Sequence, residues 1–255
     1  MSRRDAILAE MGLAPVWRLR RREALPAAEP DSAAAAADDT NDEPAMRHAN
    51  PVSAPPVAQE AEAHASREAR IAALGWPELK ATVAGCRDCK LRAGCTQTVF
   101  GVGDEAADWM IVGEAPGAEE DRQGEPFVGQ AGRLLDAMLG SLGLARGRNV
   151  YIANVLKCRP PGNRNPEPDE VAQCGPYLER QVALVKPRLI LAMGRFAVQS
   201  LLESDASIAS LRGRLHQYRG VPLVVTYHPA YLLRTLPDKA KAWADLVFAR
   251  RSMPK

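Results

Sequence analysis

Apolar and polar positions alternate in a regular pattern along the chain from about Ser66 onward. Short apolar runs predict buried strands at Trp109–Val112, Val150–Ala153, Leu189–Met193 and Leu223–Thr226. Apolar positions at helical spacing predict helices at Ser66–Ala84, Gln130–Leu142, Asp169–Val185, Arg195–Leu202 and Asp238–Arg250. Strands and helices that alternate in this way predict an α/β fold, a three-layer sandwich whose central four-stranded, mainly parallel sheet is flanked by helices.

The first 65 residues follow a different pattern. Residues 1–22 place Ile7, Leu8, Met11 and Leu13 on one face and predict a short amphipathic segment. Residues 23–65 are rich in Ala, Pro and acidic side chains and cannot bury enough apolar surface to offset the entropy of ordering. We therefore expect three parts: the N-terminal segment 1–22, a disordered linker 23–65, and one domain over residues 66–255.

The net charge of +2 is unevenly distributed. The balance is +4 over residues 1–22, −8 over residues 23–65 and +6 over the remainder. A basic domain behind an acidic linker is compatible with a nucleic-acid partner, because Lys and Arg bind phosphates. The sequence contains no secretory signal and no apolar run long enough to span a membrane, which predicts a cytoplasmic location.

Four of the five cysteines have a spacing that suggests a metal site. Cys86 and Cys89 form a C-x2-C pair, fifteen residues separate Cys158 from Cys174, and Cys95 lies outside this pattern. The alternative is a set of buried thiols with a chance pair, since free cysteine is common in cores. The spacing alone favours neither a zinc ion nor an iron–sulfur cluster clearly over the other.

Ligands of parallel α/β sheets bind beyond the carboxyl ends of the strands, so the loops there are where a site is expected. The first strand is followed by G-E-A-P-G-A-E-E-D (113–121) and P-F-V-G (126–129), the second by N-V-L-K-C-R-P-P-G-N-R (154–164), and the fourth by H-P-A-Y-L-L-R (228–234). In this order, and with the cysteine spacing, these motifs closely resemble the family-four uracil-DNA glycosylases, from about Ala84 to Arg250.

The resemblance implies a hydrolase of base-excision repair. Such an enzyme flips uracil out of DNA, because a base inside the duplex is inaccessible, and hydrolyses its N-glycosidic bond to deoxyribose. The resemblance also implies a monomer that acts on uracil-containing DNA, single- or double-stranded, and one structural 4Fe-4S cluster. The cluster ligands would be Cys86, Cys89, Cys158 and Cys174, with Cys95 a free thiol.

A uracil pocket must stack on the ring, read its edge and stabilise the charge that develops as the bond breaks. Phe127, between Gly124 and Gly129, is the predicted stacking platform. The Asn154 amide offers both a donor and an acceptor, which suits uracil and leaves unsatisfied groups facing cytosine. His228 resembles the family histidine that binds the 2-carbonyl and stabilises the leaving anion. The complete predicted substrate-binding set is Gly113, Glu114, Ala115, Phe127, Asn154 and His228.

Two acidic residues are candidates for the remaining catalytic role. Glu120 and Asp121 follow the first strand, where a carboxylate would stabilise an oxocarbenium-like state and orient water. Capping of the next segment is the alternative for both. With Asn154 and His228 they form the predicted catalytic set, and Glu120 is the preferred water-activating group.

DNA contacts are predicted on both sides of the pocket. Cations bind phosphates, and apolar side chains inserted between base steps hold a kinked duplex open. The predicted phosphate contacts are Lys157, Arg159, Arg164 and Arg234, and the predicted wedge is Leu232 with Leu233.

Two other functions are weighed against this one. A related protein class binds uracil-DNA covalently through a basic loop that ends in His, and residues 211–216 are faintly similar to such a loop. A metal-bearing module that binds DNA without catalysis is the second. The arm formed by residues 1–22 is either a docking helix for a protein partner, a fortuitous tail, or a basic segment that adds DNA affinity.

Overall fold

A six-stranded sheet forms the centre of the computed structural model, which describes residues 57–254. The strand order is β1-β3-β2-β4-β6-β5. Four of these strands are parallel and match the predicted ones: β2 (Trp109–Gly113), β3 (Val150–Asn154), β4 (Leu189–Met193) and β6 (Val221–Thr226). The α/β class and the mainly parallel sheet are thereby confirmed.

The predicted number of four strands was too low, because two short antiparallel strands close the edges of the sheet. β1 (Val102–Gly103) pairs with β3, and β5 (Leu215–Tyr218) pairs with β6. A two-residue strand leaves no apolar run to detect, and β5 alternates exposed and half-buried positions. Neither strand therefore carries the signal of a buried central strand.

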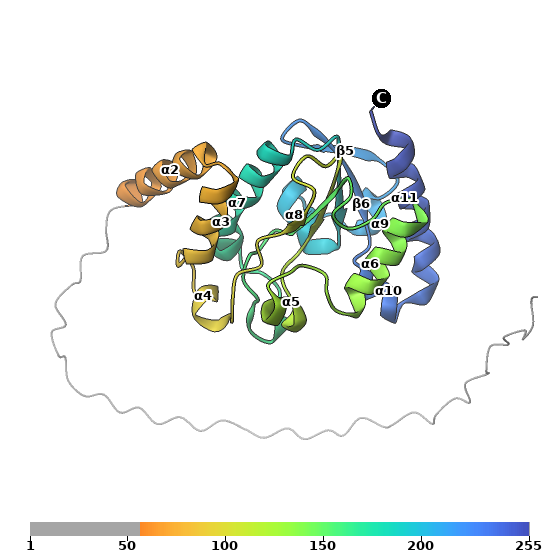
Figure 1. Cartoon of the computed structure of the whole chain (residues 1–255), viewed down its shortest axis with the longest axis horizontal. Coiled ribbons are helices and arrows are strands. Elements are labelled where there is room, and N and C mark those ends of the chain that lie inside the picture. Colours follow the sequence, from red (N-terminus) through yellow and green to blue (C-terminus); the bar gives the residue numbers. More distant parts are fainter. Residues whose placement is uncertain (1–56, 255) are drawn as a thin grey trace, which may run out of the picture. The chain divides into compact units, whose positions relative to one another are not determined.

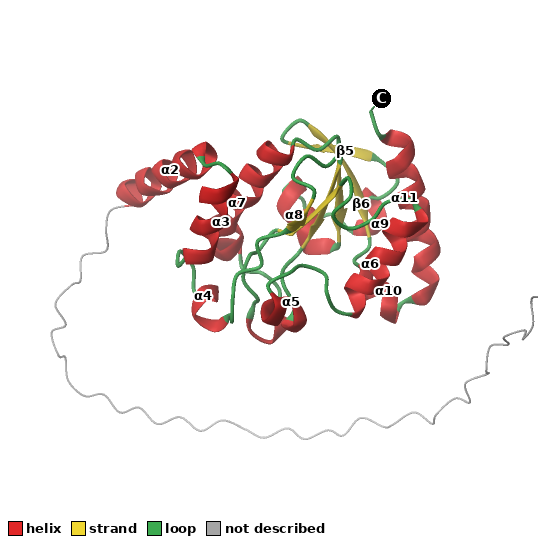
Figure 2. Ribbon diagram, in the orientation of Figure 1, coloured by secondary structure: helices red, strands yellow, loops and turns green. Residues whose placement is uncertain are grey.

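Helices cover both faces of the sheet (Figure 1; Figure 2). The four helices predicted after the first strand lie within two residues of their expected bounds: α6 (Gln130–Ser141), α7 (Pro168–Val185), α8 (Arg195–Leu202) and α11 (Lys239–Ser252). Met110 and Val112 of β2 pack in one core cluster with residues of α7 and α8. Trp109 and Ile111 pack in another with residues of α6 and α11. Alternate residues of one strand thus bury both faces, which makes the three layers.

Shorter helices occupy the loops and the chain before the sheet. They are α3 (Trp76–Gly85), α4 (Leu91–Gly94), α5 (Ala118–Gln123), η1 (Pro161–Asn163), α9 (Ile208–Leu211), α10 (Pro229–Arg234) and η2 (Leu236–Asp238). Apart from α3, none was predicted, because three to six residues carry too little periodicity. Among the described residues, no helix is long and apolar enough to cross a membrane.

The start of the domain differs from the sequence prediction. Helix α2 (Val57–Ala73) begins nine residues before Ser66, so residues 57–65, assigned to the linker, are helical. These residues follow Pro56 and are mostly Ala, Glu and Gln, which favour helix. The predicted helix over 66–84 is also interrupted at Gly75, and α3 begins at Trp76 with Pro77 in its first turn, the part of a helix that tolerates proline. The predictions for residues 1–56 lie outside the described residues.

Candidate active site

A cleft of about 480 Å³ lies at the carboxyl ends of the parallel strands, where the loops after β2, β3 and β6 meet. α5 and α10, which follow β2 and β6, lie at this edge of the molecule (Figure 1). The cleft brings together residues that the sequence assigned to uracil binding and catalysis: Glu114, Ala115, Glu120, Phe127, Asn154 and His228. The position agrees with the rule for ligand sites of open α/β sheets.

Asn154 places a polar atom without a partner at the base of the cleft. The residue ends β3, pairs in register with Gly113 of β2, and is only 2% exposed. Its Oδ1 is buried and has no hydrogen-bond partner. A Cβ on Gly113 would lie 2.4 Å from that oxygen and 2.6 Å from Cζ of Phe127. The absence of a side chain at residue 113 therefore allows the amide and the aromatic ring to lie side by side.

The aromatic loop, residues 126–129, holds Phe127 in an unusual backbone conformation. Phe127 has φ of 56°, the left-handed region that L-residues with bulky side chains disfavour. Arg146 stabilises this loop, because its Nη1 donates to the carbonyl of Pro126 at 2.8 Å and its Nη2 to that of Phe127 at 2.7 Å. Gly132 of α6 packs so closely that a Cβ there would lie 1.7 Å from the Phe127 oxygen. Arg146 carried no motif, and the sequence analysis missed it.

His228 is held as a neutral ring with a defined tautomer. It caps the N-terminus of α10, and its Nδ1 accepts the backbone N–H of Ala230 at 3.1 Å. Burial, with a smaller effect from Arg234, lowers the pKa of His228 to about 4. A neutral imidazole that accepts at Nδ1 carries its proton on Nε2. The ring also stacks on Phe127, with centroids 5.4 Å apart.

Two acidic residues of the first motif line the cleft in different environments. Burial raises the pKa of the Glu114 carboxyl group to about 7, and Glu114 lines the cleft. Glu120 also lines the cleft, and its Oε2 accepts the Gly117 N–H at 3.1 Å, which closes the first turn of α5. Both residues can therefore face a bound substrate.

Asp121 does not lie in the cleft, so its predicted catalytic role is wrong. Its carboxylate is buried and accepts both the N–H and the hydroxyl of Thr96 at 2.9 Å. Asp121 thus anchors the segment that follows Cys95. The alternative weighed for it, capping of the next segment, is the role of Glu120 and not of Asp121, because Glu120 accepts the Gly117 N–H at the start of α5 whereas Asp121 bonds to Thr96. Successive residues of a helix point to different sides.

Lys157 is also not a surface contact. It is 2% exposed, and its Nζ donates to the Asn154 carbonyl and to Oε1 of Gln181, both at 2.7 Å. Burial lowers the pKa of Lys157 to about 7. The predicted phosphate contact is therefore wrong, and the amine instead holds the backbone of the residue at the base of the cleft.

The predicted wedge is reduced to one leucine. Leu232 is 1% exposed and belongs to the core, whereas Leu233 is 38% exposed. The difference follows from helix α10, which turns neighbouring side chains about 100° apart and directs only one of them inward. Leu232 is thus removed from the predicted DNA contacts.

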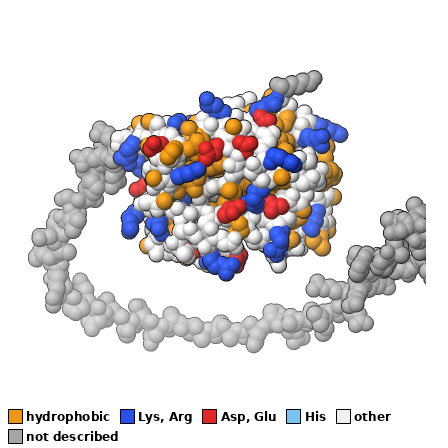
Figure 3. Space-filling view, in the orientation of Figure 1, with side chains coloured by type: hydrophobic (Ala, Val, Ile, Leu, Met, Phe, Trp, Pro, Cys, Tyr) orange, Lys and Arg blue, Asp and Glu red, His pale blue; other side chains and the backbone are white. Residues whose placement is uncertain are grey.

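Of the three remaining predicted phosphate contacts, Arg164 and Arg159 already donate hydrogen bonds to other side chains. Arg164 lines the cleft and donates two hydrogen bonds to the buried carboxylate of Glu170, at 2.9 and 2.5 Å. Arg159 donates to Oδ1 of Asn163 at 2.7 Å. Arg234 is exposed at the rim of the cleft. Basic side chains lie along the lower edge of the molecule in Figure 3, over α4, α5 and α10.

The cleft also contains residues that the sequence analysis did not single out. Phe196 at the start of α8 and Tyr231 of α10 line it together with Asn163 and Asn165. Tyr231 belongs to the motif at 228–234, whereas Phe196 follows the third predicted strand, after which no motif was assigned. The sequence could have indicated Phe196, because an aromatic residue just after a strand end is placed where a base could stack on it.

Cys89, Cys95 and Cys158 gather around Cys174 of α7, whereas Cys86 packs against a cluster that contains Tyr177 of the same helix. Cys158 and Cys174 are buried in one apolar cluster with Cys95, and Cys89 packs against it. Burial raises the pKa of Cys174 to about 11, against an opposing effect of Lys157 and with a smaller contribution from the nearby thiols of Cys89 and Cys86. Within the described residues, no three His, Cys, Asp or Glu side chains converge closely enough to hold one metal ion.

Comparison with known proteins agrees with this fold and cleft. The family model of the uracil DNA glycosylase superfamily matches residues 100–247. The chain belongs to the uracil-DNA glycosylase superfamily.

Its relatives define the position within that superfamily. The chain is 46% identical over 159 residues to a type-4 uracil-DNA glycosylase of Archaeoglobus fulgidus, covering 59% of this chain and 79% of that protein. It is 43% identical over 177 residues to one of Pyrobaculum aerophilum, covering 66% of this chain and 90% of that protein. Among superfamily members, the chain is a type-4 uracil-DNA glycosylase.

Proposed function

We propose that the cleft binds uracil flipped out of DNA and hydrolyses its N-glycosidic bond. The observation that carries this assignment is the buried Oδ1 of Asn154, which has no partner in the described structure. An unsatisfied buried acceptor costs about 1–3 kcal/mol, so it is retained where a ligand satisfies it. The N3–H of uracil is a donor of the required kind, and the amide N–H of the same side chain can donate to the neighbouring carbonyl.

His228 stabilises the charge that leaves with the base. Heterolysis of the glycosidic bond puts negative charge on the uracil ring, part of it on the 2-carbonyl oxygen. A neutral His228 with its proton on Nε2 can donate to that oxygen, while the Ala230 N–H holds the opposite nitrogen. A donor aligned before the reaction needs no reorganisation as the charge develops.

Phe127 forms one wall of the pocket, and the Arg146 contacts keep that wall in place. A base that leaves the duplex loses its stacking, and an aromatic platform restores part of it. Phe127 now stacks on His228 at a centroid distance of 5.4 Å. Entry of the uracil ring would bring it into contact with the same pair of side chains.

Glu114 and Glu120 are the two candidates for orienting the attacking water. Glu120, the preferred residue on sequence grounds, already accepts the Gly117 N–H. Glu114 makes no hydrogen bond through its carboxylate in the described structure, and its pKa of about 7 suits a group that takes a proton at neutral pH. We therefore add Glu114 to the candidates, and Glu114→Gln and Glu120→Gln separate them.

We also propose that Cys86, Cys89, Cys158 and Cys174 hold a 4Fe-4S cluster. One zinc ion needs its donors around a single point, whereas each thiolate of a cubane binds a different iron atom, so its four ligands do not converge. The proposal is supported by the gathering of the thiols: Cys158 and Cys174 share one buried cluster with Cys89 packed against it, and Cys86 lies close enough to Cys174 to affect its pKa. When bound, the cluster would cross-link the C-x2-C loop to α7 and take no part in the reaction.

DNA contacts complete the proposal. Arg234 lines the cleft, and Leu233 and Arg159 are each next in sequence to a residue that lines it, so all three can contact a duplex from which one nucleotide is flipped out. An exposed leucine beside cations is the combination used to hold a base step open.

The experiment compares single-turnover uracil release by the wild type, Asn154→Ala and His228→Ala with that of the control Gln199→Ala, which removes a side-chain amide outside the cleft. We expect the first two variants to lose about 100-fold or more, and DNA affinity to change little, since phosphate contacts supply most of it. A wild-type rate of uracil release in Asn154→Ala or in His228→Ala would mean that the active site lies elsewhere.

The same assay tests the two other functions. His216 lies on edge strand β5, and its Nε2 contacts the Leu211 carbonyl at 2.8 Å, outside the residues that line the cleft. A denaturant-resistant protein–DNA adduct would nevertheless favour the covalent class. Absence of free uracil beyond one equivalent of protein would favour the non-catalytic module.

A further inference from the structure

Arg67 of α2 connects two of the segments that carry the proposed cluster ligands. Its Nε donates to Oδ2 of Asp88 at 2.8 Å, and its Nη2 donates to the carbonyl of Gln173 at 2.9 Å. Asp88 lies between Cys86 and Cys89, and Gln173 directly precedes Cys174. One guanidinium therefore joins the C-x2-C loop to the helix that carries the fourth ligand.

The same carboxylate contacts a proposed ligand directly. Oδ2 of Asp88 accepts from the Cys86 thiol at 3.4 Å and from the Tyr177 hydroxyl at 3.4 Å. The Arg67 guanidinium lies over the Tyr177 ring, 5.2 Å from its centroid. Arg67 is thus separated from the Cys86 sulfur by a single hydrogen-bonded group.

Arg67 also has a donor left over. Its side chain is 11% exposed, and its buried Nη1 has no hydrogen-bond partner in the described structure. A buried donor without an acceptor is costly. The thiolates and sulfides of an iron–sulfur cluster are negatively charged acceptors, and hydrogen bonds to sulfur stabilise such clusters. A cation at this place would therefore be matched by the charge of the bound cluster.

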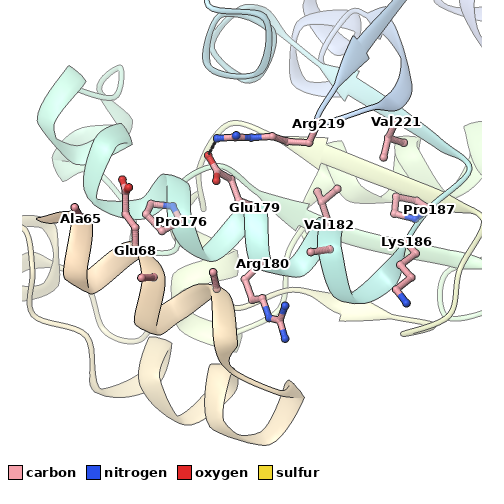
Figure 4. Close-up of a pocket in the computed structure, with 13 residues that line it drawn as sticks. Ala65, Glu68, Pro176, Glu179, Arg180, Val182, Lys186, Pro187, Arg219 and Val221 are labelled. Atoms are coloured by element: carbon pink, nitrogen blue, oxygen red, sulfur yellow. Dashed lines mark hydrogen bonds and ion pairs between the residues drawn. The ribbon is translucent and has the colours of Figure 1, made fainter.

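Apolar packing attaches only one part of α2, where Ile71 is buried in a cluster with Tyr177 of α7. A cavity of about 720 Å³ separates parts of α2 and α7 and is lined by Ala65, Glu68 and Pro176, among others. Figure 4 shows α2 beside α7, with these side chains facing the space between the two helices. Because the apolar contact is incomplete, polar contacts such as those of Arg67 carry more of the attachment.

We propose that Arg67 is a positioning residue for the cluster: it holds the C-x2-C loop against α7 and supplies a buried cation beside the thiolates. The inference rests on the proposed 4Fe-4S cluster. It gives a role to α2, a helix that precedes the residues matched by the family model. Groups that support metal ligands commonly change metal affinity about 10- to 100-fold when removed.

The test measures cluster retention, with Arg67→Met compared with Arg70→Met. Arg70 lies nearly one turn further along α2 and is exposed, so both substitutions remove a cation from the same helix and only one disturbs the contact. Proteins purified without chelator are assayed for iron, and the visible absorption is followed in air with an iron chelator. We expect Arg67→Met to bleach about 10-fold faster than wild type and Arg70→Met to match wild type.

Further measurements separate the possible outcomes. Arg67→Lys keeps the charge but loses the fork of donors, and we expect an intermediate rate of bleaching. If far-UV circular dichroism shows that Arg67→Met does not fold, Arg67→Lys replaces it as the test variant. Equal bleaching of the wild type and all three variants would overturn the role of Arg67 alone. A wild type without iron would overturn the cluster, and the role of Arg67 with it.

Discussion

Replacing Lys157 by Met tests whether this lysine belongs to the core or to the DNA surface. The substitution keeps the length of the side chain but removes the donor that contacts the Asn154 carbonyl and Oε1 of Gln181, each at 2.7 Å. Two buried acceptors then lack a partner, at about 1–3 kcal/mol each. Removal of the buried amine offsets part of this, because an amine is costly to desolvate. We expect a net loss of about 2–4 kcal/mol in the free energy of unfolding.

The effect is large enough to measure by thermal unfolding. In a domain of this size, 1 kcal/mol corresponds to about 2–4 °C, so Tm should fall by roughly 4–16 °C. Single-turnover uracil release should fall by about 10- to 100-fold, because the backbone of Asn154 loses a contact that positions it. Iron content is measured alongside, since Cys158 is the next residue.

DNA binding provides the contrasting measurement. Loss of a phosphate contact lowers the slope of log affinity against log salt by about 1, and loss of a buried lysine leaves it unchanged. Lys80→Met is the control for thermal unfolding, because Lys80 is 52% exposed and pairs with Glu105 on the surface. An unchanged Tm together with a shallower salt dependence would refute the buried role and restore Lys157 as a phosphate contact.

Three further predictions concern the cleft. Gly113→Ala should lower uracil release by about 100-fold at constant DNA affinity, because the new methyl group would lie 2.4 Å from Oδ1 of Asn154; a near-wild-type rate would mean that this oxygen is not used. Arg146→Met frees the carbonyls of the aromatic loop and should reduce both release and Tm, and a loss of Tm alone would contradict the positioning role. If Glu114 takes the proton from water, the rate should fall as pH drops below about 7, and Glu114→Gln should abolish that fall. His228 stays neutral down to about pH 4 and adds no change between pH 7 and 5, so the same fall in Glu114→Gln would assign it to another group.

Local patterns in the sequence were sufficient for the main architecture. A run such as Leu189–Met193 is apolar at every position because both of its faces are covered, and this makes a central parallel strand recognisable without any partner. Helical periodicity likewise located α7 within one residue. Since such sheets bind ligands at the carboxyl ends of their strands, Asn154 and His228 could be assigned to one cleft from the order of the strands.

Single-residue assignments failed where neighbouring side chains have opposite surroundings. Leu232 and Leu233 are equivalent as sequence letters, yet one is 1% exposed and the other 38%. Glu120 lines the cleft, whereas the carboxylate of Asp121 is buried against Thr96. The rotation of a short helix, set by what it packs on, decides between such neighbours, and six residues are too few to show it as periodicity.

The supporting residues depended entirely on tertiary structure. Arg67 reaches Asp88 and Gln173 across 21 and 106 positions of sequence, and Arg146 reaches the aromatic loop across 19 and 20. Neither arginine belongs to a motif, and from the sequence alone each would be expected to be an exposed cation. The sequence determined which polar and aromatic side chains follow the strand ends, and the proposed recognition of uracil depends on those functional groups. Only the tertiary structure decided which charged side chains are buried and support those groups. Burial depends on the neighbours that pack around a residue and not on the residue itself.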